Sequence, residues 1–171
     1  METEILEKLR KIKLLAMDFD GVMTDGAVYV NQDGIETVRC SRKDGLGIEM
    51  LKRAGILAYV ISKEINPVVA ARCNKLKIQC WQKVENGEGK AEILKRIMAE
   101  QSLAKEEVAY MGDDLNDVAP LQIAGVSFTV ADGHEAVKKV SDYVTKAVGG
   151  RHAVREVCEL ILEAKGLELK F

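Results

Sequence analysis

Residues 14–25, LLAMDFDGVMTD, decide the fold that we expect for this chain. The mostly apolar run Ile12–Phe19 has a carboxylate, Asp18, near its end. A second carboxylate, Asp20, and then Gly21 follow the run directly. Apolar runs of this length that are bounded by turn residues are typical of buried strands. The stretch therefore predicts a buried strand that carries a pair of acids at its carboxyl end.

Strand-like and helix-like segments alternate along the rest of the chain. Further strands are predicted at Ile56–Ser62, Ile78–Gln82, Val108–Gly112 and Val126–Val130. Helices are predicted at Gly45–Ala54, Asn66–Leu76, Gly89–Gln101, Asp117–Ala124, Glu135–Val140 and Ala153–Lys165. Strands that alternate with helices of about 10 to 15 residues form βαβ units and a parallel sheet that is covered on both faces.

One segment interrupts the alternation. Ala27–Cys40 consists of two short strand-like runs around Asp33-Gly34, a dipeptide that favours hairpin turns. We expect an α/β fold, a three-layer, doubly wound and mostly parallel sheet, with this β-hairpin inserted after the first strand. Residues 1–171 are predicted to form a single domain, with 27–40 as a hairpin flap and 149–171 as a C-terminal tail and helix.

Composition and charge exclude several classes of function. The 171 residues carry a net charge of −2 without a basic stretch, so a nucleic-acid partner is not expected. The apolar runs are far shorter than the roughly 20 residues of a membrane span, and the N-terminus lacks the apolar region of a signal peptide. The four cysteines form no C-x-x-C pair, which argues against a zinc site. We expect a cytoplasmic protein without a membrane partner.

Chemically suggestive side chains follow the predicted strands. Ser62 closes the second strand, Lys90 opens the helix after the third, and GDDLND, with Asp113, Asp114 and Asp117, follows the fourth. Each of these alone is more often a turn residue, a helix cap or a solvated side chain. Ligands bind beyond the carboxyl ends of the strands in open α/β sheets, so the whole set is predicted to face one crevice with Asp18 and Asp20.

These residue types suit phosphoryl transfer. A carboxylate can attack phosphorus to form an aspartyl-phosphate, and a second carboxyl group two residues on can protonate the leaving oxygen and then activate water. Mg²⁺, which prefers oxygen ligands, would offset the repulsion between the phosphate and the carboxylates. Asp18 and Asp113 would bind the metal ion, while Lys90 and Ser62 would contact the transferring oxygens.

The same residues resemble the haloacid dehalogenase superfamily of phosphatases over essentially the entire chain. DFDGVMTD matches the first motif of the superfamily, D-x-D-G-x-x-T-D, while Ser62, Lys90 and GDDLND match the other three. The resemblance implies that Asp18 is the nucleophile and Asp20 the general acid and base. It also implies that Asp18, the Asp20 main-chain carbonyl and Asp113 hold Mg²⁺, supported by Asp114 or Asp117.

Within the superfamily the chain resembles the small capless branch typified by 3-deoxy-D-manno-octulosonate 8-phosphate phosphatase. The short hairpin, the segment RKDGLGIEML and the ending VGGRHAVREV carry this resemblance, and no stretch is long enough for a cap domain. The branch implies a homotetramer in which Gly149, Gly150 and Arg151 reach an adjacent subunit. Arg151 could then grip a substrate carboxylate.

The segment after Ser62 departs from the octulosonate pattern. Lys63 and Glu64 replace the usual Gly-Arg, and Glu64 with Lys75 resembles relatives that act on nine-carbon acids, such as 2-keto-3-deoxynononic acid 9-phosphate phosphatase. The expected substrate is therefore a 2-keto-3-deoxy sugar acid phosphate with eight or nine carbons, from lipopolysaccharide or sialic acid biosynthesis. Glu64, Lys75 and Arg151 are its candidate contacts. The alternatives are that Glu64 and Lys75 are solvent-facing helix residues and that Arg151 is a plain residue at the start of a helix.

The sequence leaves two alternatives to an enzyme of this kind. The chain could be a non-catalytic tetramerisation or regulatory module that is associated with a sialic-acid-type cytidylyltransferase, whose phosphatase-like domains it resembles. All the motif residues are intact, which favours the enzyme. A response-regulator receiver domain would need a phosphoacceptor aspartate after a central strand, and the second and third predicted strands end instead in Ser62 and Trp81-Gln82.

Overall fold

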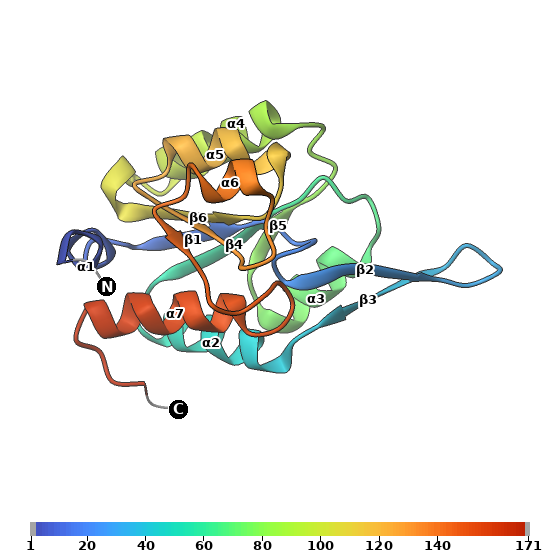
Figure 1. Cartoon of the computed structure of the whole chain (residues 1–171), viewed down its shortest axis with the longest axis horizontal. Coiled ribbons are helices and arrows are strands. Elements are labelled where there is room, and N and C mark those ends of the chain that lie inside the picture. The colour runs from blue at the N-terminus through green and yellow to red at the C-terminus, as the bar shows by residue number, and fades with distance from the viewer. Residues whose placement is uncertain (1–2, 170–171) are drawn as a thin grey trace.

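Strand β1 (Leu14–Met17) lies in the middle of the sheet in the computed structural model, which describes residues 3–169 (Figure 1). All residues of β1 are buried, and the strand pairs in parallel with β4 on one side and β6 on the other. The sheet has six strands in the order β5-β4-β1-β6-β7-β8, and every pairing in it is parallel. The expected doubly wound α/β fold is confirmed.

The other elements lie close to their predicted positions. The remaining strands of the sheet are β4 (Leu57–Ile61), β5 (Gln79–Trp81), β6 (Val108–Gly112), β7 (Val126–Thr129) and β8 (Tyr143–Val144). The helices are α1 (Thr3–Leu9), α2 (Arg42–Arg53), α3 (Val68–Leu76), α4 (Gly87–Glu100), α5 (Val118–Ile123), α6 (Glu135–Lys138) and α7 (Ala153–Ala164), with short 3₁₀ helices η1 (Lys105–Glu107) and η2 (Leu115–Asp117). The elements α1, β8, η1 and most of η2 were not predicted, and β8 is too short to show a period. No helix among residues 3–169 has the length and apolar character that a membrane crossing requires.

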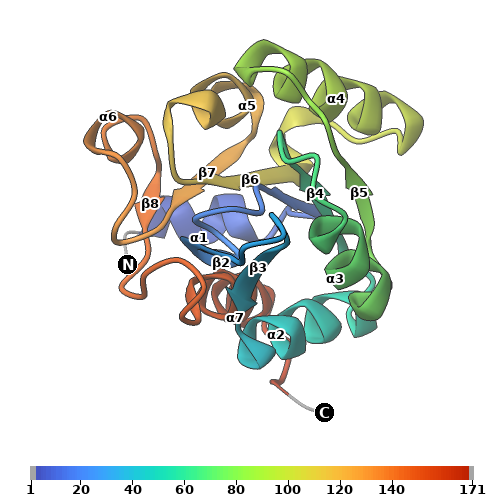
Figure 2. The same ribbon diagram turned by 90° about the vertical axis from the view of Figure 1, so that its right-hand side faces the viewer.

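Alternate residues of β1 supply the two cores of the protein. Leu15 and Met17 belong to a core that also takes buried side chains from α2, α3 and α7, whereas Leu14 and Ala16 belong to a second core under α4 and α5. Figure 2 shows these two groups of helices on opposite faces of the sheet. The side-chain period of two in a strand sends successive residues to opposite faces, which is why a fully apolar strand fits here.

The segment RKDGLGIEML forms most of α2, and one acid and one glycine in it explain how α2 packs against α7. Asp44 is buried, and its carboxylate accepts hydrogen bonds from the backbone N–H groups of His152 at 3.4 Å and Arg155 at 2.9 Å, so it caps the start of α7. A Cβ at Gly47 would lie 3.0 Å from the Arg155 Cα, so the two helices approach too closely for a side chain. Asp44 and Gly47 therefore fix where α7 begins.

The hairpin stands apart from the main sheet. Strands β2 (Thr24–Val30) and β3 (Glu36–Cys40) form an antiparallel pair of their own, which Figure 1 shows projecting away from the body of the molecule. Gly34 adopts a φ of 75° in the turn between them. Val28, Tyr29, Val30 and Ile35 are 49%, 63%, 61% and 63% exposed, so the hairpin presents apolar side chains to the outside.

Candidate active site

A buried lysine ties the first and fourth motifs together. Lys90, in the first turn of α4, is fully buried, and its Nζ lies 2.6 Å from Asp18 Oδ2 and 2.8 Å from Asp117 Oδ1. Burial alone would lower the pKa of Lys90, but the two carboxylates outweigh it and the pKa is raised, so the ammonium stays charged. The burial of Lys90 therefore excludes the alternative that it is a solvated helix residue.

Asp117 organises the fourth motif. Its Oδ1 accepts hydrogen bonds from Lys90 and from the hydroxyl of Tyr110, and its Oδ2 accepts one from the backbone N–H of Asp113 at 3.1 Å. The side chain is fully buried. Tyr110 was not singled out from the sequence, although its place in β6, two residues before GDD, puts it under the same loop.

Asp18 is held at the carboxyl end of β1 beside these groups. It is 5% exposed, and its Oδ1 accepts a hydrogen bond from the Phe19 N–H at 2.7 Å. Burial, followed by repulsion from Asp117, raises the pKa of Asp18, while Lys90 and the Phe19 N–H act in the opposite direction. A cation that binds next to Asp18 would favour the ionised form further.

Asp113 is the carboxylate in this cluster that lacks a partner. Within residues 3–169 its carboxylate oxygens accept no hydrogen bond. Burial, Asp117 and Asp114 raise the pKa of Asp113 from its usual value of 3.8 to about 7. A Cβ at Gly21 would lie 1.9 Å from Asp113 Oδ2, so only glycine allows the loop after β1 to pass this carboxylate.

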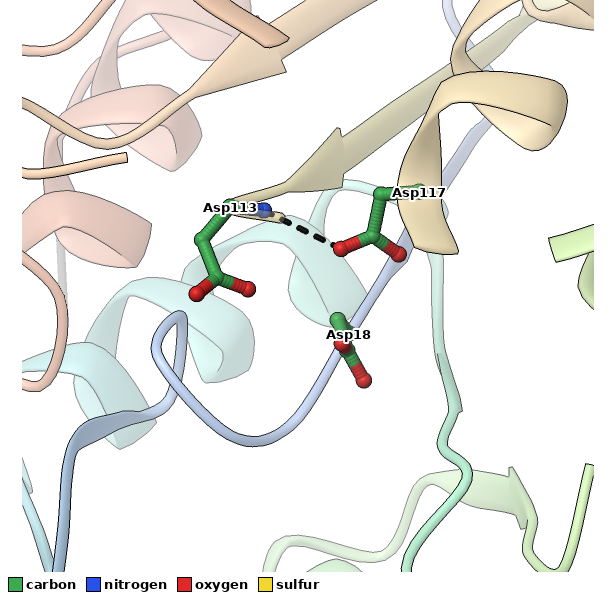
Figure 3. Close-up of side chains that lie close together, drawn as sticks. All are labelled: Asp18, Asp113 and Asp117. Carbon is green, nitrogen blue, oxygen red and sulfur yellow. Dashed lines mark hydrogen bonds between the residues drawn. The ribbon is translucent and has the colours of Figure 1, made fainter. Parts of the chain in front are cut away.

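Carboxylate oxygens of Asp18, Asp113 and Asp117 lie within 4.8 Å of one another, which suits a metal ion (Figure 3). Both oxygens of Asp117 already accept hydrogen bonds, so Asp18 and Asp113 are better placed to bind the ion. The sequence placed Asp20 in the metal set and Asp117 in support, whereas the side-chain cluster contains Asp117 and not Asp20. The carbonyl contact of Asp20 stays a prediction.

Asp20 faces the same space from the loop after β1. Its Oδ1 lies 3.4 Å from the Thr24 hydroxyl, and the Thr24 oxygen accepts hydrogen bonds from the Gly21 and Gly26 N–H groups at 3.2 Å each. Burial and then repulsion from Glu64 raise the pKa of Asp20. A raised pKa is what a carboxyl group needs to carry a proton near neutral pH.

Ser62 and Glu64 shape the loop after β4. Ser62 is buried, and its Oγ accepts the Glu64 N–H at 3.0 Å, which leaves its own hydroxyl hydrogen able to donate toward the site. The Glu64 carboxylate accepts the N–H groups of Ile65 at 2.7 Å and Asn66 at 2.8 Å. Glu64 therefore has a structural role in ordering this loop, in addition to lining the site.

Two cavities open beside the aspartates. One of about 510 Å³ is bordered by Gly21, Gly26, Asp113 and Asp114, and the other, of about 490 Å³, by Ser62, Glu64 and Ile65. Asp18, Asp20, Lys63 and Asn116 border both of them. The structure thus brings together most of the predicted site, and it adds Lys63 and Asn116.

Lys75, by contrast, lies elsewhere in this chain. It borders a separate cavity with Glu49, Lys52 and Lys77, none of which borders the cavities at the aspartates. Within this chain the structure does not bring Lys75 to the cavity that Glu64 borders, and a contact of Lys75 with the substrate stays a prediction. Helix α3 begins near the carboxyl edge of the sheet and runs back toward the other edge, which takes Lys75 with it.

Gly149 and Gly150 make close contacts within their own chain. Both are buried in their own chain, where the Gly150 N–H donates to the Val22 carbonyl at 2.9 Å and the Gly149 N–H donates to Asp132 Oδ1 at 2.9 Å. They pack on the loop that carries Asp20, and their contact with an adjacent subunit stays a prediction. Arg151, which follows them, is exposed.

Substituting Gly149 with alanine is expected to disturb the catalytic loop. The new Cβ would lie 1.8 Å from the Gly21 carbonyl oxygen, so the backbone must shift, at a cost of about 1–3 kcal/mol in the free energy of unfolding. We expect a lower Tm together with a lower kcat. Gly55→Ala is the control, because Gly55 has a φ of 75° but open space around it, so its substitution strains the backbone without touching the site. A wild-type kcat for Gly149→Ala would contradict this prediction.

Comparison with known proteins defines the class to which this site belongs. Residues 54–157 match the family of haloacid dehalogenase-like hydrolases, a stretch that contains Ser62, Lys90 and the aspartates of the fourth motif. Relatives that are more than 30% identical extend the similarity over the first motif as well. The chain belongs to the haloacid dehalogenase-like hydrolases, and it is a phosphatase of that family, as expected.

The relatives belong to one branch of the family. The chain is 36% identical to 3-deoxy-D-manno-octulosonate 8-phosphate phosphatase KdsC of Salmonella typhi over 167 residues, which is 97% of this chain and 87% of the relative. It is similar in structure to the enzyme of the same name from Yersinia pestis, with a TM-score of 0.93, 35% identity and coverage of 97% and 89% of the two chains.

A third relative has been solved with a metal ion and two other ligands bound. The 3-deoxy-D-manno-octulosonate 8-phosphate phosphatase of Moraxella catarrhalis, in complex with a magnesium ion, a phosphate ion and a KDO molecule, matches with a TM-score of 0.92. It is 38% identical, and the match covers 97% of this chain and 94% of that chain. Together with the carboxylate cluster of Asp18 and Asp113, the magnesium ion in that relative confirms the expected cofactor, Mg²⁺.

Proposed function

We propose that the protein hydrolyses the phosphate monoester of a 2-keto-3-deoxy sugar acid, with 3-deoxy-D-manno-octulosonate 8-phosphate as the first candidate. The observation that carries the proposal is the Asp18–Lys90–Asp117 network at the carboxyl end of β1. Three relatives that match nearly the whole chain, from Salmonella typhi, Yersinia pestis and Moraxella catarrhalis, are phosphatases of this substrate.

Asp18 is the nucleophile in the proposed reaction. Its carboxylate attacks phosphorus, the bond to the sugar oxygen breaks, and an aspartyl-phosphate forms on Asp18. Lys90 and the Phe19 N–H hold the carboxylate in place, and the charged Lys90 supports its anionic form. Ser62 donates its hydroxyl hydrogen to a phosphoryl oxygen, which stabilises the charge that moves there.

Asp20 transfers the protons. In its neutral form, which its raised pKa favours, it gives a proton to the departing sugar oxygen. The resulting carboxylate then takes a proton from the water that attacks the aspartyl-phosphate, so phosphate is released and both aspartates return to their starting state. The Thr24 hydroxyl, 3.4 Å from Asp20 Oδ1, orients the side chain for both steps.

The residues of this chain that would hold Mg²⁺ are Asp18 and Asp113, with the Asp20 main-chain carbonyl as the proposed third ligand. Asp113 fits this role because its half-buried carboxylate lacks a hydrogen-bond partner among residues 3–169. When bound, Mg²⁺ supplies positive charge that offsets the phosphate and the carboxylates. Asp114 accepts the Leu115 N–H at 2.7 Å and Asp117 the Asp113 N–H, so both support the loop.

Steady-state assays of phosphate release test the proposal. The eight-carbon and the nine-carbon sugar acid phosphates are compared in the presence of Mg²⁺ and after chelation of the metal. We expect turnover that requires Mg²⁺, and acid-quenched peptide mass spectrometry should find the phosphoryl group on the peptide that contains Asp18. Absence of turnover with both substrates would favour the non-catalytic module that associates with a cytidylyltransferase.

The stability of the metal-free protein should fall as the pH rises. The pKa of Asp113 is about 7 in the folded protein and near 3.8 in the unfolded chain, so the folded state holds an extra proton between these values. Stability that depends on this proton is present at low pH and is lost as the pH rises through about 7. Mg²⁺ should raise Tm more at about pH 8 than at about pH 5.5, because it binds the ionised carboxylate.

Thermal unfolding with and without Mg²⁺ at the two pH values measures both effects. Asp113→Asn is the matched variant, since it keeps the shape of the side chain but cannot titrate. It should show a weaker dependence of Tm on pH and a smaller response to Mg²⁺. Equal pH profiles for the wild type and Asp113→Asn would contradict the prediction.

We propose in addition that the hairpin mediates a homotetramer. Val28, Tyr29, Val30 and Ile35 expose apolar surface that isolated hairpins seldom carry, and a second copy of the chain would cover it. Tyr29→Lys with Val30→Lys is expected to yield smaller species in sedimentation analysis. Glu163→Lys, at an exposed position on α7, adds the same two units of charge away from the hairpin and is the control. An unchanged sedimentation coefficient for the hairpin variant would count against this interface.

A further inference from the structure

Lys63 and Asn116 border both cavities beside the catalytic aspartates, and the phosphoryl chemistry gives neither of them a role. Lys63 follows Ser62 after β4, and Asn116 lies in η2 after β6. Strands β4 and β6 flank β1 on opposite sides, so the two residues approach the nucleophile from either side. A ligand that extends from Asp18 into these cavities would pass between them.

The charges around the cavities are strongly unbalanced. Their walls carry the carboxyl groups of Asp18, Asp20, Asp113, Asp114 and Glu64. Among the described residues that line the two cavities, Lys63 is the one with a cationic side chain. Lys90 is fully buried behind Asp18 and already bound to two carboxylates, so it offers nothing to the outer part of a ligand.

The ammonium of Lys63 is free to bind such a ligand. The side chain is exposed, and within residues 3–169 it forms no hydrogen bond or ion pair. The nearest acid in the chain, Glu64, uses its carboxylate to accept the N–H groups of Ile65 and Asn66. Lys63 is therefore an unpaired cation at the rim of an acidic site.

We propose that Lys63 binds the carboxylate of the substrate and thereby selects phosphorylated sugar acids over neutral sugar phosphates. This inference deepens the proposed function and rests on it for the identity of the substrate. The phosphoryl end of such a substrate is held at Asp18, and its second anionic group needs a cation further out. Asn116, on the opposite side, offers an amide that can donate to or accept from the sugar hydroxyl groups.

Substrate discrimination in Lys63→Met tests the inference. The ratio of kcat/KM for 3-deoxy-D-manno-octulosonate 8-phosphate to kcat/KM for p-nitrophenyl phosphate is measured with Mg²⁺. We expect this ratio to fall by roughly 10- to 100-fold, the effect of losing a hydrogen bond to a charged group. Lys63→Arg should restore most of it. Lys11→Met, which removes a positive charge before β1 at the other edge of the sheet, should leave the ratio unchanged. A ratio in Lys63→Met within twofold of the wild type would overturn the inference.

A second measurement separates this inference from the proposed function. Unphosphorylated 3-deoxy-D-manno-octulosonate is tested as an inhibitor of p-nitrophenyl phosphate hydrolysis, which requires no turnover of a sugar acid phosphate. Its inhibition constant should rise by roughly 10- to 100-fold in Lys63→Met. If inhibition changes in this way while the wild type hydrolyses no sugar acid phosphate, the substrate proposal fails and the carboxylate contact stands. Equal inhibition of the wild type and Lys63→Met, or none of either, would overturn the contact.

Discussion

Replacing Asp18 with asparagine is expected to lower kcat by at least about four orders of magnitude. The amide cannot attack phosphorus as the carboxylate does, so the proposed aspartyl-phosphate cannot form. Phosphate release at saturating substrate and Mg²⁺ measures the effect, and the peptide that contains residue 18 should carry no phosphoryl group after an acid quench. A kcat within tenfold of the wild type would remove Asp18 from the mechanism.

The same substitution should leave the fold intact, which distinguishes loss of chemistry from loss of structure. Asparagine has nearly the shape of aspartate, and burial together with Asp117 makes the ionised form of Asp18 unfavourable. We therefore expect a Tm for Asp18→Asn at least as high as that of the metal-free wild type. Glu92→Gln, which removes an exposed carboxylate on α4, is the control for charge and should change neither kcat nor Tm noticeably.

Lys90→Met is expected to cause the largest loss of stability. Methionine fits the space of the lysine stem, but it leaves Asp18 and Asp117 buried without the cation they share. Breaking a buried ion pair in this way costs about 3–5 kcal/mol. For a chain of this length, such a change in the free energy of unfolding lowers Tm by roughly 6–20 °C. Turnover should fall as well, since Lys90 no longer holds the nucleophile.

A double variant identifies the cause of that instability. Adding Asp117→Asn to Lys90→Met removes one of the two unpaired charges, so it should recover part of the lost Tm without recovering kcat. If the cause were a packing defect, the second substitution would lower Tm further. A Tm for Lys90→Met equal to that of the wild type would show that the ammonium does not offset the two carboxylates.

The fold and the centre of the site could be predicted from the sequence for one shared reason. Parallel strands bring their carboxyl ends to a single edge, so Asp18, Ser62, Lys90 and Asp113 meet once the strand pattern is known. The pattern along the chain does not show burial, however. The residues next to Lys90 in the sequence are equally compatible with a solvated lysine. Its contact with Asp117 depends on how α4 packs against η2, which the sequence does not show.

The positions that the sequence does not reveal depend on distance along an element and on packing between distant segments. Lys75 lies near the end of α3, a helix of 9 residues, so it is roughly 10 Å along the axis from Val68, where the helix begins after the loop that borders the site. The family resemblance predicts that Gly149 and Gly150 reach a neighbouring subunit, and within their own chain their lack of side chains allows close contact with the loop of Asp20. No local pattern distinguishes these two uses of glycine.

The contact between Gly150 and Val22 has a consequence for the order in which the protein becomes active during synthesis. The loop that carries Asp20 leaves the ribosome well before the segment on which it packs, and Asp44 must also wait for the start of α7, which it caps. Strands β1 and β4 can pair while translation continues. The loop that carries Asp20 reaches its final position only when residues near 150 have emerged, so a ribosome-bound fragment that stops before them should be folded in part and inactive.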